Sequence, residues 1–171
     1  MKNLYEKGYK SYPKKTIFIT NSLFLVFFVF AAIGMLPLRV GIFPVFSLTY
    51  LFFVFFVLIL GTCKHLCTHC YYHGKLCGYG WGKFSSLLFQ RNSGNFDFGS
   101  ILCDFSWKIS LIAPLALILI EIFLFPKFII IGISCFTICL IMIFLSLYVR
   151  SRYICSKCKR KNTCIASISK D

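Results

Sequence analysis

Acidic side chains are scarce in this sequence. Its 171 residues include only five Asp and Glu, whereas 58% of them are hydrophobic and 21 are Phe. A soluble domain of this length has too little interior to hide so much apolar surface, but a lipid bilayer covers it. The composition therefore argues against a soluble globular protein and for an integral membrane protein.

Recognisable catalytic motifs are missing as well. The sequence contains no acid–base pair, no nucleophile elbow and no phosphate loop that would support an enzyme. The glycines of Cys77–Phe84, CGYGWGKF, come nearest, but Walker A requires Gly-x4-Gly-Lys-Ser/Thr, and Lys83 replaces the last glycine of the dinucleotide fingerprint. We interpret this stretch as a flexible turn. A non-enzymatic protein is favoured, although an active site completed by partner subunits would leave no such motif.

Four hydrophobic runs are long enough to cross a membrane. They are Thr16–Leu36, Ile42–Leu60, Ile109–Phe125 and Phe128–Val149. About 20 apolar residues cover a hydrocarbon core of roughly 30 Å, and the third run reaches this length if it extends backwards through Ile101–Trp107. One run alone would also suit a buried soluble helix. Four in one small chain predict an all-α, multi-pass membrane protein with four transmembrane helices in two hairpins.

Basic residues are distributed unevenly between the segments that join these runs. Five lie in residues 1–15, five between the hairpins and seven in the C-terminal tail, whereas the hairpin turns hold only Arg39 and Lys127. Because Lys and Arg accumulate on cytoplasmic loops, we expect both termini and the middle segment to be cytoplasmic, in a plasma-membrane protein. The net charge of +14 then reflects topology and attraction to anionic lipid. No nucleic-acid recognition motif accompanies it, so no such partner is expected.

The expected organisation alternates hairpins with polar segments. A basic tail (residues 1–15) precedes the first hairpin (16–62), a cysteine-rich segment (63–107), the second hairpin (108–149) and a basic, cysteine-containing tail (150–171). The middle segment is too short for an ordinary hydrophobic core, so a metal or the membrane must stabilise it. Within Lys83–Arg91, the spacing of Phe84, Leu87 and Leu88 suits a short helix lying on the headgroup surface.

Seven of the ten cysteines form two clusters, each directly after a hydrophobic run. The first comprises Cys63, Cys67, Cys70 and Cys77, and the second Cys155, Cys158 and Cys164. Both clusters contain a Cys-x2-Cys pair, the spacing with which one tight turn presents two sulfurs to a metal ion. Cytosolic thiols are normally kept reduced, so metal ligation or redox chemistry is favoured over structural disulfides.

Zinc takes four thiolate or imidazole ligands in a tetrahedron, and two Cys-x2-Cys pairs supply four. We expect one Zn²⁺ bound by Cys67, Cys70, Cys155 and Cys158, with the other clustered cysteines as further candidate ligands. The protein would then be a membrane-anchored scaffold or accessory subunit whose zinc site orders a docking surface for a protein partner at the cytosolic face. A redox protein with an iron–sulfur cluster or reactive thiols is the alternative, and metal transport or sensing is the third.

The two clusters also carry a resemblance to known sequences. The stretches Cys67–Cys77 and Cys155–Cys164 resemble the Cys-x2-Cys-x-Tyr-x-Gly-x2-Cys segment and the cysteine-rich basic tail of uncharacterised prokaryotic four-span membrane proteins. The resemblance covers most of the chain and implies the same two-cluster arrangement. It implies no function.

Three side chains inside the expected spans have chemistry of their own. Cys135 and Cys139 lie one helical turn apart and would suit copper or mercury if a methionine were near. Only Met142 is close in the sequence, so we interpret both cysteines as small apolar packing residues. Glu121 is expected at the outer membrane interface, in an ion pair with Lys127.

Overall fold

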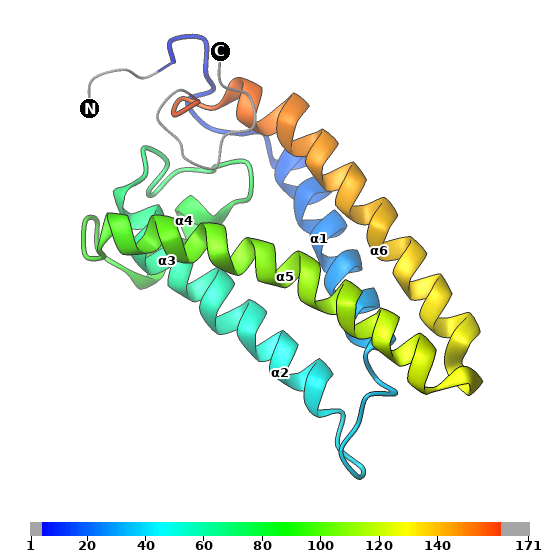
Figure 1. The fold of residues 1–171 in the computed structure, drawn as a ribbon. Coiled ribbons are helices and arrows are strands. Elements are labelled where there is room, and N and C mark those ends of the chain that lie inside the picture. Colours follow the sequence, from blue (N-terminus) through cyan, green and yellow to red (C-terminus); the bar gives the residue numbers. More distant parts are fainter. Residues whose placement is uncertain (1–4, 162–171) are drawn as a thin grey trace.

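Four long apolar helices dominate the structure, a computed structural model that describes residues 5–161 (Figure 1). The helices long and apolar enough to cross a membrane are Lys14–Gly34, Val45–His69, Phe96–Leu124 and Pro126–Lys157. No β-strand occurs in the described part of the chain. The predicted fold class, an all-α protein with four membrane-spanning helices, is confirmed. Lengths and compositions of this kind belong to a membrane-embedded protein in a lipid bilayer.

The second and fourth spans are built alike. The second comprises α2 (Val45–Phe53), the π-helical η1 (Val54–Gly61), α3 (Thr62–His65) and the 3₁₀ turn η2 (Cys67–His69). The fourth comprises the 3₁₀ turn η3 (Pro126–Phe128), α6 (Ile129–Val149), the π-helical η4 (Arg150–Ile154) and the 3₁₀ turn η5 (Cys155–Lys157). Each span therefore passes through a π-helical stretch before it delivers a Cys-x2-Cys pair on a 3₁₀ turn.

The remaining helices are α1 (Lys14–Gly34), α4 (Trp81–Leu88) and α5 (Phe96–Leu124). Helix α5 begins thirteen residues before the apolar run at Ile109, because Asn95 caps its N-terminus by accepting a hydrogen bond from the Phe98 N–H at 3.1 Å. The polar residues Asp104 and Lys108 remain inside the helix as an i,i+4 ion pair of 2.6 Å.

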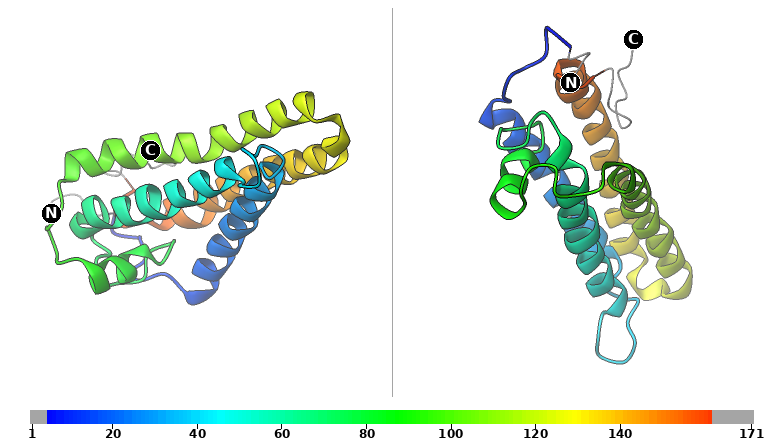
Figure 2. Two further views of the ribbon diagram at one scale, coloured as in Figure 1. Left: turned by 90° about the horizontal axis from the view of Figure 1, so that it is seen from below. Right: turned by 90° about the vertical axis from the view of Figure 1, so that its left-hand side faces the viewer.

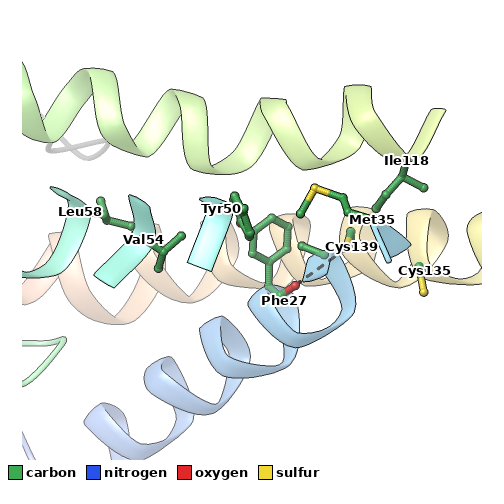
Figure 3. Packing of buried hydrophobic residues seen from close by; sticks show 9 residues of the cluster. Phe27, Met35, Tyr50, Val54, Leu58, Ile118, Cys135 and Cys139 are labelled. Atoms are coloured by element: carbon green, nitrogen blue, oxygen red, sulfur yellow. Dashed lines mark hydrogen bonds between the residues drawn. The ribbon is translucent and has the colours of Figure 1, made fainter. Parts of the chain in front are cut away.

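Small residues let the helices approach closely at the core of the bundle. The buried core cluster comprises Phe27, Ala31, Met35, Tyr50, Val54, Leu58, Ile118, Cys135 and Cys139 (Figure 3). A methyl group built on Gly34 of α1 would lie 2.7 Å from the Ile118 side chain of α5. Many large apolar residues face outwards instead, among them Phe18 at 74% exposure, as expected for helices whose surroundings are lipid.

The polar segments gather at one end of the bundle, opposite the two hairpin turns (Figure 2). We call this end the cap and define it as residues 5–13, 66–95 and 154–161. Its first and last segments pair through the backbone, where the Tyr5 and Tyr9 N–H groups donate to the carbonyls of Lys159 and Lys157 at 2.9 and 2.8 Å. The Tyr12 N–H donates to the Leu76 carbonyl at 2.9 Å, so all three cap segments are joined.

Two buried tyrosines hold these cap segments together. The Tyr12 side chain is 3% exposed and donates to the Ile154 carbonyl at 2.6 Å, next to the second cysteine pair. The Tyr72 hydroxyl donates to the Tyr9 carbonyl at 2.8 Å and accepts from the Lys159 N–H at 3.0 Å. Burial raises the pKa of both tyrosines well above the usual value, so both hydroxyls stay protonated as donors. Nothing in the local sequence pattern indicated this contact.

Candidate functional site

The two Cys-x2-Cys pairs adopt the same turn. The Cys70 N–H donates to the Cys67 carbonyl at 3.1 Å, and the Cys158 N–H donates to the Cys155 carbonyl at 3.2 Å. The second cysteine of each pair is extended, with φ, ψ of −80°, 150° at Cys70 and −83°, 131° at Cys158. Segments separated by two membrane helices thus present paired sulfurs in matching backbone geometry.

Both turns line one cavity of about 190 Å³ in the cap. The cysteines among its lining residues are Cys67, Cys70, Cys77, Cys103, Cys155 and Cys158. Five of the seven predicted candidates are therefore brought together. Cys103 of α5 was not among the predicted candidates, because no local spacing linked it to the other cysteines.

Cys63, another predicted ligand, does not line the cavity. Cys63 is fully buried in α3, where its side chain is in hydrogen-bonding contact with Cys67. Cys164 lies outside the described residues.

The Cys77 sulfur accepts a hydrogen bond from the backbone of its own loop. The Gly82 N–H donates to Sγ at 3.4 Å, and the Gly80 N–H donates to the Cys77 carbonyl oxygen at 2.9 Å. Burial raises the pKa of the Cys77 thiol, and the backbone N–H groups of this loop, Gly82 foremost, act in the opposite direction. Donors of this kind stabilise a thiolate, the form of cysteine that binds metal.

The glycines of the Cys77 loop have steric roles. Gly80 is in the left-handed region with φ +79°, which allows the loop to curl around the sulfur. A methyl group on Gly82 would lie 2.8 Å from the Lys75 carbonyl oxygen and closer still to that of Tyr72. One on Gly78 would lie 2.5 Å from the Ile154 side chain, directly before the second cysteine turn. The loop therefore links the two cysteine clusters.

Aromatic rings and cations complete the cavity wall. Trp81 and Trp107 stack with centroids 6.1 Å apart and an interplanar angle of 11°, and both line the cavity. Arg150, Arg160 and Lys161 line it as well. Positive groups beside a set of thiols favour anionic sulfur there.

Two of the three histidines near the first cluster already serve the fold. His69 Nε2 lies 2.7 Å from the Gly94 carbonyl, and His65 Nδ1 accepts from the Asn95 N–H at 3.2 Å. These bonds fix the loop that leads into α5. His73 has a buried Nδ1 without a hydrogen-bond partner in the structure, and burial together with Arg91 lowers its pKa.

The thiols surround a space and do not form a closed single-ion site. Within residues 5–161, no group of three or more His, Cys, Asp or Glu side chains lies close enough together to hold a metal ion. The arrangement supplies sulfur ligands, backbone donors and compensating cations around a cavity. Any single ion bound there would have to draw the two turns inwards.

Comparisons with known proteins give no indication of what this site does. No family model, no curated protein and no solved structure matches this chain.

Proposed function

We propose that the cap is a cysteine-ligated metal site that fastens the middle segment to the C-terminal tail of a membrane scaffold or accessory subunit. The observation that carries this proposal is the pair of matching Cys-x2-Cys turns on one cavity. Zn²⁺ bound by Cys67, Cys70, Cys155 and Cys158 would join the ends of the second and fourth spans. Cys77, Cys63 and Cys164 are the reserve ligands.

The cap needs such a fastening because its own core is small. Its buried apolar cluster consists of Tyr12, Tyr72 and Ile154, with partly buried neighbours around them. Modules of this size usually rely on a metal or on disulfides for stability. Metal binding to thiolates contributes directly to the free energy of folding.

The matching spans provide a way to close the site. Each cysteine turn follows a π-helical stretch, η1 or η4, and π-helical turns inside longer helices are frequent at functional sites. Small adjustments there would move the paired sulfurs towards an ion at about 2.3 Å. The tetrathiolate would carry a formal charge of −2, which the cations of the cavity wall would offset.

In this proposal the cap faces the cytoplasm of the cell and docks a protein partner. The concentration of Lys and Arg in the cap segments supports this orientation. Helix α4 would lie at the headgroups, because Phe84, Leu87 and Leu88 are exposed while Ser85 is buried and donates to the Cys63 carbonyl at 2.8 Å. The ordered cap would then present a basic surface at the membrane.

A redox protein is the second candidate function, and the volume of the cavity favours it. A single Zn²⁺ requires its ligands to close inwards, whereas an iron–sulfur cluster occupies more space and takes its thiolates from the surrounding walls. Six cysteines line the cavity of about 190 Å³, and among the described residues no three of them lie close enough together to hold one metal ion. That arrangement suits a polynuclear group.

Metal analysis of the full-length protein, purified without added metal, separates the two candidates. The scaffold proposal expects about one zinc per chain and no visible absorption. Iron with acid-labile sulfide and a brown colour would replace it with the redox candidate. Protein that folds with neither metal, with its cap amides protected from hydrogen exchange, would contradict both the zinc site and the iron–sulfur cluster, and would leave reactive thiols as the form of the redox candidate.

A further inference from the structure

Some polar side-chain atoms in the described part of the chain are buried without a hydrogen-bond partner. They belong to Thr62, His73, Tyr79 and Glu121. The expected ion pair between Glu121 and Lys127 is therefore wrong, since neither carboxyl oxygen of Glu121 has a partner, and this side chain packs against Gly132 of α6 instead. Thr62 and Tyr79 differ from the other two because both line the cap cavity. A buried donor without an acceptor costs free energy, so these two hydroxyl groups indicate a ligand that supplies acceptors.

The two hydroxyl groups reach the cavity from different segments. Thr62 begins α3 and is 2% exposed, and Tyr79 lies in the Cys77 loop with its hydroxyl oxygen buried. Burial raises the pKa of Tyr79 well above its usual value, so this hydroxyl keeps its proton. A threonine hydroxyl is always protonated. Both groups can therefore donate a hydrogen bond to an oxygen inside the cavity.

Aromatic rings form the wall of the cavity next to Tyr79. Its ring centroid lies 5.7 Å from that of Trp81 and 6.3 Å from that of Trp107, and both tryptophans line the cavity. An aromatic wall of this kind favours a planar, unsaturated ligand that stacks on it. The Arg150 guanidinium interacts electrostatically with Tyr79 and also lines the cavity, so its positive charge favours an electron-rich oxygen in the ligand.

The volume and position of the cavity limit the ligand further. At about 190 Å³ the cavity is smaller than the roughly 300–1,000 Å³ of ordinary small-molecule pockets, so it admits a single ring and excludes a dinucleotide or a flavin cofactor. Its lining residues include Thr62, Trp107 and Arg150, which belong to three of the four apolar spans. The cavity therefore lies at the ends of membrane helices, where a lipid-soluble ligand can reach it. A quinone combines a planar ring, carbonyl acceptors and solubility in lipid.

We propose that the cap cavity binds the ring of a quinone. The hydroxyl groups of Thr62 and Tyr79 donate to its carbonyl oxygens, and the ring packs against Trp81 and Trp107. Binding needs neither the zinc proposed for the cap nor any covalent or redox step, so the proposal goes beyond the scaffold function and does not rest on it. A bound quinone would also be the membrane-soluble electron acceptor that the redox candidate requires.

The test uses the intrinsic fluorescence of the full-length protein in detergent, titrated with duroquinone. Trp81 and Trp107 are the two tryptophans of the chain, so their fluorescence reports on this wall of the cavity. The methyl groups of duroquinone occupy every ring position to which a cap thiol could add. We expect saturable quenching. Quenching that rises linearly with the quinone concentration would show collisional contact only and would overturn the proposal.

Two variants test the hydrogen bonds to the quinone. Tyr79→Phe and Thr62→Val each remove a hydroxyl that has no partner in the structure, so neither is expected to destabilise the fold. Each should weaken quinone binding roughly threefold to tenfold, the usual effect of one net hydrogen bond. Tyr148→Phe and Thr137→Val are the matched controls on α6, because neither residue lines the cavity, and both should bind the quinone like the wild type. Saturable quenching with the same apparent Kd in all variants and the wild type would refute the site.

Discussion

Replacing Cys67 by serine is expected to remove the bound zinc, and replacing Cys158 is expected to remove it equally. Each substitution takes one sulfur from a different turn, and a serine hydroxyl does not replace a thiolate as a zinc ligand. Loss of a residue that only orients a ligand already costs roughly 10–100-fold in metal affinity, so loss of a ligand should cost at least as much. The measurement is the ratio of zinc to protein in variants purified in parallel.

The control for this pair is Cys135→Ser, which removes a buried thiol of α6 outside the cap and should retain the zinc. Equal losses in the Cys67 and Cys158 variants would agree with one ion held by both turns. Loss in the Cys67 variant alone would mean that the first cluster binds the ion by itself. The fastening between the middle segment and the tail would then be wrong.

The second large effect is expected for Gly82→Ala. Its new methyl group would meet the carbonyl oxygens of Tyr72 and Lys75, and both are backbone atoms that yield only if the turn moves. Overpacking of this kind typically costs about 1–3 kcal/mol. The substitution also displaces the N–H that donates to Cys77 Sγ. We expect faster hydrogen exchange throughout the cap and a lower metal content.

Gly74→Ala provides the comparison. Gly74 has φ +78° but nothing lies within 4 Å of a methyl group built there, so its substitution costs only about 1 kcal/mol of backbone strain. Hydrogen exchange of the cap should increase less in this variant than in Gly82→Ala. A larger effect of Gly74→Ala would show that the close contact at Gly82 does not control the cap.

The membrane fold was accessible to sequence reasoning because apolar runs of about 20 residues have one stable form in a bilayer, the helix. The boundaries of the helices could not be predicted equally well from the sequence. The start of α5 at Phe96 depends on a single cap from Asn95, and the i,i+4 pair of Asp104 and Lys108 keeps charged residues within the helix. The pattern of apolar residues in the sequence did not predict the π-helical stretches η1 and η4.

Only part of the candidate site could be predicted from the sequence. Cysteine spacing predicted the two turns, because both cysteines of a turn are neighbours in the sequence. Tyr12 contacts Ile154, and Cys103 lines the cavity beside the cysteines of both turns. These residues are far apart in the chain, so the periodicity of hydropathy along the sequence does not predict that they meet.

The central claim is that one metal ion is bound by both cysteine turns, and zinc K-edge X-ray absorption on the purified full-length protein tests it most directly. The claim predicts about four sulfur neighbours at about 2.3 Å from the zinc. A shell of two sulfurs completed by nitrogen or oxygen would contradict it, as would a sample in which the bound metal is iron with short iron–iron scattering.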